Sequence, residues 1–482
     1  MANLTIFGLT QLTSAGADIV NDLVPVWDNS ALETKKMTLS DLRNLMSPVN
    51  WSDSFSSATQ ATSSWTPNNA AANVNAAIIP KGTGAIVAAI PDGTATGGNA
   101  RGSNTVDLQR VRSAANSVAG GDQSVLLGGN NNRIASTADR SVLVGGISNL
   151  DSGSRSVLVG GEQNNVSGSY ASCVGGLQNT ISGNYSFVGG GQSITASGQW
   201  SAVVGGQSNT ASGNHSTAIG QGSTASGINS FAGGGGTASG SGAFVFGSCT
   251  GNSEASIAIG RNCTANNTGQ RGMIAMGNTC STTYEGGVAL GANCGTSNFG
   301  AVALGQGNSA TGLGTRATGR ESRAELQGQV SHAGGQFSAQ GDAQAHELIW
   351  RRAITGTAQT ELFLDGSSIA AILPATNTVW NGIIDIAAIC TVTGDGTTVV
   401  GDVEATAYKV TIKRIGTTTS LVGGVQEIGI TNADASMATA VFTIDNNDTN
   451  ESLRIRFTPP STAGSTTVIR AVATFRGTQI KY

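Results

Sequence analysis

Acidic side chains are the first candidates for chemistry, because hydrolysis of a polysaccharide needs two carboxylates about 5–9.5 Å apart. The glycine-rich middle of the chain contains a sequence repeat, and its acidic residues mostly stand at different positions of that repeat. Stacking of the repeats is therefore not expected to bring any two of them together. These acids are Asp122, Asp139, Asp151, Glu162, Glu254 and Glu285. Asp385, Asp395 and Asp402 come later, and turn chemistry accounts for the last two. We therefore expect no catalytic residues and no enzyme activity.

Histidines and cysteines have no spacing typical of a catalytic or metal site. His215, His332 and His346 are too scattered for a triad or a zinc site. Four cysteines follow glycine corners of the repeat: Cys249, Cys263, Cys280 and Cys294. Disulfides between repeats and a zinc site are alternatives, but buried thiols are favoured because a free cysteine packs as a small apolar group. We expect neither a metal nor a cofactor.

The middle of the chain is a repeat. The stretch "SVLVGGEQNNVSGSY", residues 156–170, returns as "ASCVGGLQNTISGNY" and again as "SAVVGGQSNTASGNH". Its period is about 15 residues, which allows two short strands and two turns in each repeat. Stacked repeats of this kind form a β-solenoid, in which each repeat is one coil.

The apolar strand of the repeat shows no alternation of apolar and polar residues. Val157, Leu158 and Val159 are all apolar, although successive side chains of a strand point to opposite faces. One face can line the interior of the coil, and a neighbouring chain is the simplest cover for the other. The polar second half, such as "NVSGSY", can face water. We therefore expect a symmetric homo-oligomer with the apolar strands toward its axis.

A ladder of larger side chains precedes the apolar strands at intervals of 15 residues: Arg140, Arg155, Tyr170, Tyr185, Trp200 and His215. Equivalent residues of stacked coils lie about 4.8 Å apart, close enough for ring contact. The aromatic members could stack on sugar rings of a cell surface. Alternatively, they seal the corner between chains, which is favoured because the ladder adjoins the strand expected at the axis.

Composition and charge argue against several classes of function. Glycine is abundant at 69 residues, and charged residues are only 11%, against about a quarter in typical proteins. The net charge of −4 comes without a basic patch, so we expect no nucleic-acid partner. The amino terminus lacks the pattern of a secretory signal, and no stretch is long and apolar enough to insert into a membrane.

Residues 122–319 carry a resemblance to a known family. "STAIGQGSTASGINS", "SIAIGRNCTANNTG" and "GVALGANCGTSNFGAVALGQGNSATG" resemble the head repeat of trimeric autotransporter adhesins. The resemblance implies a left-handed parallel β-roll assembled as a homotrimer, here over residues 122–320. The chain lacks the signal peptide, heptad stalk and membrane anchor of those adhesins, which disfavours a bacterial surface adhesin.

The amino-terminal flank resembles bacteriophage tail-fibre proteins. In residues 1–50, "DLVPVWD" predicts a strand, "NSALETKK" a turn and "TLSDLRNLM" a short helix capped by Thr38 or Ser40. The pattern is similar to the virion-attachment segment of those fibres, with Val24, Trp27, Leu39 and Leu42 as contacts to a tail, baseplate or adaptor protein. Residues 51–74 form a Ser/Thr-rich linker. Residues 75–121, with "PKGTGA", "PDG", "GGNARG" and "VDLQ", resemble the segment that starts the glycine repeats of phage fibres.

The carboxy-terminal flank resembles a β-domain of phage and prophage tail proteins. Residues 321–345 form a transition, and residues 346–482 contain strand-like runs separated by turns such as "TGDGT" and "DNNDTN". Strands spaced in this way predict an antiparallel β-sandwich.

Together the flanks imply a mainly β, homotrimeric phage tail fibre located in the virion and assembled in the host cytoplasm. We expect it to attach to a host-cell surface glycan without catalysis. The alternatives are a tailspike that hydrolyses surface polysaccharide and a bacterial adhesin. An aromatic ring beside amides and carboxylates suits a saccharide, which makes the receptor-binding candidates Trp380, Asn381, Asp395, Tyr408, Asn446, Asn447 and Asn450.

Overall fold

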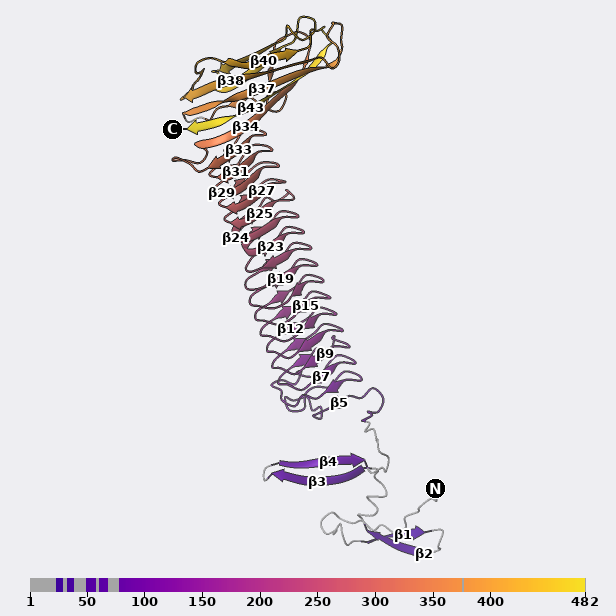
Figure 1. Ribbon diagram of the computed structural model, residues 1–482. Helices are drawn as coiled ribbons and strands as arrows, with labels where there is room; N and C mark the ends of the chain where they lie inside the picture. Colours follow the sequence, from indigo (N-terminus) through magenta and orange to yellow (C-terminus); the bar gives the residue numbers. More distant parts are fainter. Residues whose placement is uncertain are drawn as a thin grey trace. The chain divides into compact units, whose positions relative to one another are not determined.

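The computed structural model describes residues 78–374 and 377–481 and, before them, the backbone of four strands. Every regular element in the described part of the chain is a β-strand (Figure 1). The chain divides into two units, residues 1–82 and 83–482. No helix in the described part is long and apolar enough to cross a membrane.

The first unit contains two hairpins. Strand β1 (Leu23–Asp28) pairs antiparallel with β2 (Glu33–Thr38), and β3 (Val49–Ser57) with β4 (Gln60–Pro67). The predicted strand at β1 is confirmed, and it carries Val24 and Trp27.

Two local predictions in this unit differ from the structure. Glu33 to Lys36 were expected in a turn but belong to β2, because pairing with β1 supplies backbone partners that local propensity does not reveal. The segment expected as a linker contains β4 and most of β3. Leu39, Leu42 and the remainder of the expected helix after Thr38 lie outside the described residues.

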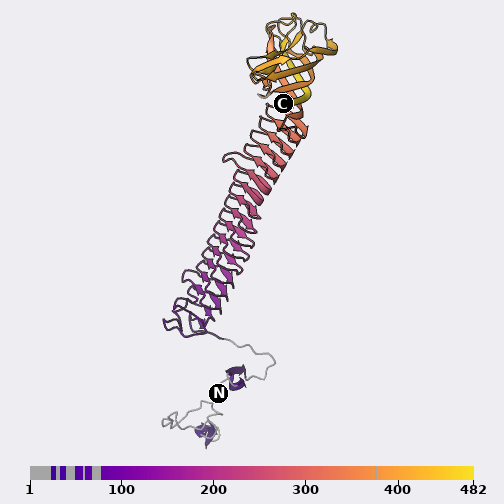
Figure 2. The same cartoon turned by 90° about the vertical axis from the view of Figure 1, so that its left-hand side faces the viewer.

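The second unit begins with the predicted parallel β-solenoid, in which each coil contributes strands to two sheets (Figures 1 and 2). The first sheet is built from β5 (Ile86–Val87), β6 (Val106–Asp107), β7 (Val125–Leu127), β9 (Val142–Val144), β11 (Val157–Val159), β13 (Ser172–Cys173), β15 (Phe187–Val188), β17 (Ala202–Val203), β19 (Thr217–Ile219), β21 (Phe231–Gly233), the first halves of β23 (Phe244–Gly251) and β24 (Ile257–Ala265), β25 (Ile274–Asn278), β27 (Val288–Ala292), β29 (Val302–Gln306), β31 (Arg316–Arg320) and β33 (Val330–Gly334).

The second sheet is built from β8 (Arg133–Ile134), β10 (Leu150–Asp151), β12 (Asn165–Val166), β14 (Thr180–Ile181), β16 (Thr195–Ala196), β18 (Thr210–Ala211), β20 (Thr224–Ala225), β22 (Thr237–Ala238), the second halves of β23 and β24, β26 (Ser281–Thr282), β28 (Gly295–Thr296), β30 (Ser309–Ala310) and β32 (Arg323–Ala324). Each strand pairs in parallel with its equivalent on the next coil; Val157, for example, pairs with Val142 and Ser172.

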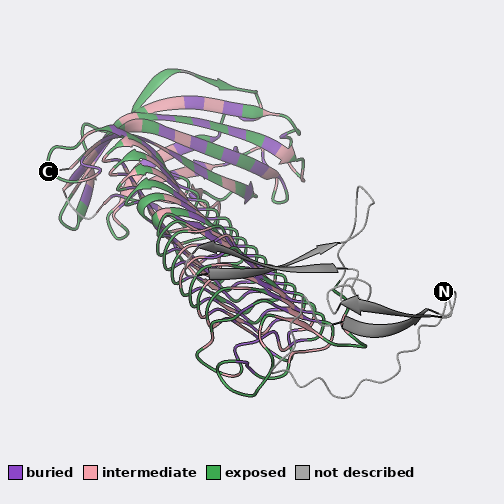
Figure 3. Cartoon of the chain, turned by 90° about the horizontal axis from the view of Figure 1, so that it is seen from below, coloured by how far each residue is buried: buried purple, intermediate pink, exposed green. Residues whose placement is uncertain are grey.

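The solenoid core lies between the two sheets, and its side chains become smaller along the rod. The central residues of the first sheet are fully buried: Leu126, Leu143, Leu158, Cys173, Val188, Val203, Ala218, Ala232, Val245, Ala258, Ala275, Ala289, Ala303 and Ala317. The flanking side chains lie on the outer face, where Val157 and Val159 remain 37% and 40% exposed beside a fully buried Leu158. Figure 3 shows by colour how buried and exposed positions are distributed along the chain. The strand therefore has one apolar face inside the coil and one outside it, as expected.

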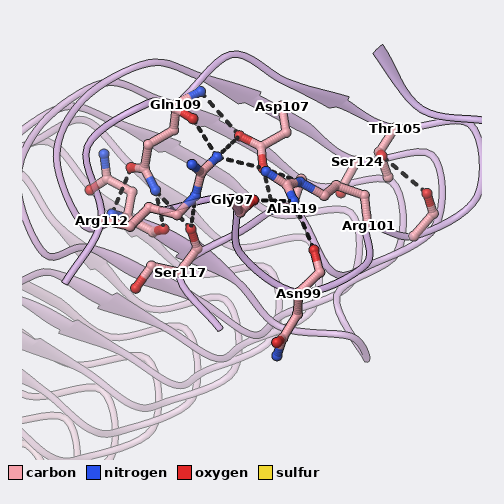
Figure 4. A network of polar contacts seen from close by, with 12 residues as sticks. Gly97, Asn99, Arg101, Thr105, Asp107, Gln109, Arg112, Ser117, Ala119 and Ser124 are labelled. Atoms are coloured by element: carbon pink, nitrogen blue, oxygen red, sulfur yellow. Dashed lines mark hydrogen bonds and ion pairs between the residues drawn. The ribbon is translucent and has the colours of Figure 1, made fainter. Parts of the chain in front are cut away.

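A buried ion cluster lies near the first coils (Figure 4). Asp107 contacts Arg101 Nε at 2.8 Å and Arg112 Nη2 at 3.3 Å, and all three side chains are shielded from solvent. Gln109 extends the network by donating to the carbonyls of Ser117 and Asn132 at 2.8 and 3.0 Å. Removal of one charge from such a cluster leaves the others buried and uncompensated, which makes this end of the solenoid sensitive to mutation.

The solenoid continues into antiparallel sheets, because β33 pairs antiparallel with β34 (Ala343–Thr355). The larger sheet adds β43 (Val468–Lys481), β37 (Thr378–Val392), β38 (Val403–Ile415), β39 (Thr418–Leu421) and β40 (Gln426–Ala433). The smaller sheet contains β35 (Thr360–Leu362), β42 (Ser452–Thr458), β36 (Ala371–Ile372) and β41 (Val441–Asn447). Residues of both sheets, among them Trp350, Phe457 and Phe475, share one core. We refer to residues 343–481 as the C-terminal domain.

Candidate functional site

The ladder of large side chains forms at the corners of the solenoid. Tyr170, Tyr185, Trp200 and His215 all adopt positive φ, between 55° and 59°, at the turn before the first-sheet strand. Backbone bonds hold each turn to the previous coil; Tyr185 N, for example, donates to Ser169 O at 2.9 Å. The predicted stacking at intervals of 15 residues is therefore present. We call these four residues the aromatic ladder.

The rings of the aromatic ladder stack on one another. Centroids lie 4.8 Å apart between Tyr170 and Tyr185, 5.6 Å between Tyr185 and Trp200, and 4.7 Å between Trp200 and His215. Arg155 lies over Tyr170, with its Cζ atom 5.1 Å from the ring centroid. Both faces of Tyr185 and Trp200 are thus covered by neighbouring rings. A sugar ring stacks on an open aromatic face, so the geometry favours a structural role for the ladder.

A second ladder lies inside the solenoid. It was not predicted, because the second half of the repeat is polar and was expected to face water. The asparagines of this ladder are buried: Asn132, Asn149, Asn164, Asn179, Asn209 and Asn308. Asn164 Nδ2 donates to Gly176 O at 3.0 Å, and its Oδ1 accepts from Asn179 N at 3.0 Å. An asparagine three residues after most of the glycine pairs was the available signal.

The cysteines replace these asparagines in later coils. Cys249, Cys263, Cys280 and Cys294 are buried and unpaired, as expected. Cys280 Sγ lies 3.3 Å from Gly291 O, in the position where asparagine amides donate in other coils. Burial raises the pKa of Cys249 to about 11, so this thiol is unreactive.

Trp380 is the candidate that the structure contradicts. It is fully buried in the core of the C-terminal domain, where its Nε1 donates to Gln479 Oε1 at 2.8 Å. His346 packs edge-on against its ring, with centroids 4.8 Å apart. The alternating burial of β37 places Trp380 on the same inner face as Ile384 and Ile386, so it offers no surface to a receptor.

The other receptor-binding candidates are not brought together. Asn381 is exposed at the start of β37 and accepts a hydrogen bond from Thr411 Oγ1 at 2.8 Å. Asp395 follows the opposite end of that strand, whose span from Asn381 to Val392 is about 36 Å at the rise of a β-strand. Tyr408 is partly buried and packs against the core, where burial raises its pKa.

The asparagine loop lies away from Asp395. Asn446 Nδ2 donates to Thr419 O at 2.7 Å, and Asn447 Oδ1 accepts from Thr449 N at 3.1 Å and from Asn450 N at 3.3 Å. These bonds stabilise the turn between β41 and β42. The side chains of Asn446 and Asn447 therefore stabilise the local structure, and the loop does not combine with Asp395 into one surface.

Asp385, Asp395 and Asp402 were the acids considered for the alternative of polysaccharide hydrolysis. In the structure each of them stabilises a turn or lies in an ion pair. Asp395 accepts bonds from Ser465 Oγ at 2.7 Å and Thr466 N at 3.0 Å, which lower its pKa to about 2. Asp402 accepts from Ser436 Oγ and from Val399 N at 2.8 Å, and its pKa is also lowered. Asp385 lies 3.7 Å from Arg476 Nη1. Neither Asp395 nor Asp402 has the raised pKa of a general acid.

Glu404 and Glu427 are a pair of carboxylates whose pKa values are shifted in opposite directions. Burial raises the pKa of Glu404 to about 7, while the hydroxyls of Thr431 and Thr406 lower that of Glu427. Such a division is typical of acid–base pairs. However, Glu404 is only 5% exposed, and neither glutamate lines the neighbouring groove of about 540 Å³ on β37 and β38. Within the described residues, no group of three or more His, Cys, Asp or Glu side chains could hold a metal ion.

Comparisons with known proteins give little further information. No protein-family model matches the chain, and no curated protein matches it. Among solved structures, the chain was aligned with the crystal structure of the tailspike protein of Acinetobacter baumannii phage AM24 at 8% identity and a TM-score of 0.16. The alignment covers 78% of this chain and 58% of that protein. A TM-score this low carries no argument about fold or function.

Proposed function

We propose that the chain is a receptor-binding tail fibre of a bacteriophage, which attaches the virion to a host-cell surface glycan without catalysis. The observation that carries the proposal is the direct hydrogen-bonded continuation of a long solenoid into a terminal domain through β33 and β34. A rod that carries a domain at its end suits display at a distance. The resemblance of residues 1–50, residues 75–121 and the carboxy-terminal flank to segments of phage tail proteins supports the same conclusion.

The proposed fibre is a homotrimer. The outward face of the first sheet carries an apolar stripe along the rod, in which Val157, Val159, Phe187, Phe244 and Phe246 are 37–47% exposed. A stripe of this length indicates an interaction surface. A second copy of the chain matches it in length and in coil spacing, and the resemblance to adhesin heads favours three copies. Three receptor sites would also combine weak individual affinities.

The two ends of the fibre have different tasks in this proposal. Residues 1–50, with Val24, Trp27, Leu39 and Leu42, attach to a tail, baseplate or adaptor protein of the virion. The C-terminal domain contacts the glycan. Assembly takes place in the host cytoplasm, and the protein then resides in the virion.

The test is to mix the purified protein with host cells and with their surface polysaccharide, following both adsorption and release of reducing ends. Adsorption without release is the expected result. Release would favour a depolymerase and direct mutagenesis to Glu404 and Glu427. Sedimentation analysis of wild type and Phe246→Asp tests the trimer, since a charge on the apolar stripe should dissociate it; a monomeric wild type would contradict the assembly.

A further inference from the structure

Three arginines of the C-terminal domain form no ion pair with an acid in the part of the chain that the structure describes. Four others are paired: Arg414 with Glu451 at 3.4 Å, Arg476 with Glu347 at 3.2 Å, and both Arg454 and Arg456 with Asp445. The remaining three, Arg351, Arg352 and Arg470, form no ion pair with any described residue. These same three line one cavity of about 270 Å³, together with Ala353, Gly366, Ala471 and Val472. We call it the arginine pocket.

Strand register creates the arginine pocket. In the antiparallel pair of β34 and β43, Ala353 lies opposite Arg470 and Arg351 opposite Val472. Arg351 and Arg470 are therefore diagonal neighbours on one face of the sheet, and both are exposed. Like charges at such positions repel each other unless an anion lies between them. The sequence predicted no basic patch, because these residues are far apart along the chain.

Neighbouring backbone carbonyls and one ring hold two of the guanidinium groups, those of Arg351 and Arg352, in place. Arg352 Nη1 donates to Glu361 O at 3.2 Å and to Ser367 O at 3.3 Å, and its Cζ atom lies 5.1 Å from the centroid of Phe363. Arg351 Nη2 donates to Asp365 O at 3.4 Å. These contacts use few of the five N–H donors of each group, so most remain available to a ligand.

The nearest acids do not neutralise the pocket. The carboxylate of Asp365 accepts backbone bonds from Ser367, Ser368 and Ile369 at 2.8–2.9 Å, and so stabilises its own loop. Burial raises the pKa of Glu361, and Arg454 opposes that rise more strongly than Arg352 does. Glu361 therefore offsets part of the charge of Arg352, whereas Arg351 and Arg470 form no ion pair with a described acid.

We propose that the arginine pocket binds an anionic group, carboxylate or phosphate, of a host surface polysaccharide. The inference rests on the proposed fibre function and deepens it by naming the class of receptor. Guanidinium groups match carboxylate and phosphate oxygens with paired hydrogen bonds. The cavity is slightly smaller than the roughly 300–1,000 Å³ of pockets that enclose a whole ligand. It therefore accepts one charged sugar unit, while the rest of the polymer lies outside.

The test uses the full chain and four probes: hyaluronate, teichoic acid, neutral dextran and inorganic phosphate. Hyaluronate presents carboxylates and teichoic acid presents phosphodiesters, so the two polymers separate the two sources of anion. We expect wild type to bind one of them and not dextran, with affinity that falls as salt rises. The double variant Arg351→Gln/Arg470→Gln should lose about 100-fold in affinity, corresponding to two charge-assisted hydrogen bonds.

Two further variants control for charge and folding. Lys409→Gln removes one exposed positive charge from the same sheet outside the pocket, and should bind as wild type does. Arg351→Lys keeps the charge but lacks the guanidinium fork, so it should weaken binding while it melts as wild type does.

Several outcomes would contradict the proposal that the arginine pocket binds an anionic group. These are equal binding by wild type and the double variant, equal binding of duplex DNA, binding of no anionic probe, and loss of trimer stability in the double variant with unchanged glycan binding. In the last case the arginines would pair with a neighbouring chain. Host-cell adsorption separates the two proposals. If the double variant still adsorbs fully, the fibre function is supported and anion binding by the arginine pocket is contradicted. If wild type binds anions but adsorbs to no host cell, the fibre function fails.

Discussion

Asn164 and Asn179 occupy the same corner of successive coils, and the Oδ1 atom of Asn164 accepts a hydrogen bond from the backbone N–H of Asn179 at 3.0 Å. The amide of Asn164 simultaneously donates to Gly176 O. Each of the six buried asparagines accepts a hydrogen bond from a backbone N–H of the next coil in this way. This arrangement supplies buried backbone groups at the sharp corners of a narrow solenoid with hydrogen-bond partners.

We expect Asn164→Ala to destabilise the solenoid by about 1–3 kcal/mol, because it leaves the N–H of Asn179 and the carbonyl of Gly176 without these partners. Asn164→Cys should lose less, since cysteines serve this position in later coils. The measurement is urea unfolding followed by circular dichroism. Asn165→Thr is the control, because Thr180 and Thr195 hold that position in the next coils. Equal losses for Asn164→Ala and Asn165→Thr would contradict the role of the ladder.

The paired glycines of each corner should respond unequally to alanine. A Cβ atom at Gly146 would lie 2.4 Å from both Asn149 Nδ2 and Gly161 O, whereas at Gly145 it meets nothing within 4 Å. Both residues have positive φ, so both substitutions cost the roughly 1–2 kcal/mol of a left-handed residue. We expect Gly146→Ala to lower the melting temperature clearly more than Gly145→Ala. Identical melting curves would show that the corner can relax around the methyl group.

Trp200→Ala distinguishes the two interpretations of the aromatic ladder. Removal of the indole deletes two stacked contacts, each worth about 0.5–1.5 kcal/mol. We expect a lower melting temperature of the assembled protein and unchanged adsorption to host cells. Reduced adsorption with an unchanged melting curve would instead favour sugar recognition by the ladder.

Asp151 should make stability depend on pH. It is fully buried in a column with Ile134 and Val166, and burial raises its pKa from 3.8 to about 7. The folded state therefore retains a proton that the unfolded chain has released, so stability falls as pH rises from about 4 to 7. Asp151→Val should stabilise the protein progressively over that range, by up to about 4 kcal/mol at 1.4 kcal/mol per pKa unit.

The measurement for Asp151 is the melting temperature of wild type and variant between pH 4 and pH 8. Glu162→Gln, which removes an exposed acid from the next coil, should show no such trend. A constant difference between Asp151→Val and wild type across this range would rule out the titration of Asp151.

The parts of the fold that depend on residues close together in the sequence were predictable. The 15-residue repeat contains its own register, so the stacked strands, the buried Leu158 and the ladder at Tyr185 follow from spacing alone. Trp380 was misjudged because its partner Gln479 is distant in sequence, although the alternation with Ile384 and Ile386 indicated an inner face. The arginine pocket could not be predicted, since only the pairing of β34 with β43 brings Arg351 and Arg470 together.

The reversal of direction between β33 and β34 gives the rod a defined end. A stack of parallel coils exposes at its last strand a row of unpaired backbone groups, onto which another stack could grow. In this chain that edge is occupied by an antiparallel strand of the chain's own C-terminal domain. Growth in one dimension stops there, so the number of coils encoded in the chain sets the length of the solenoid.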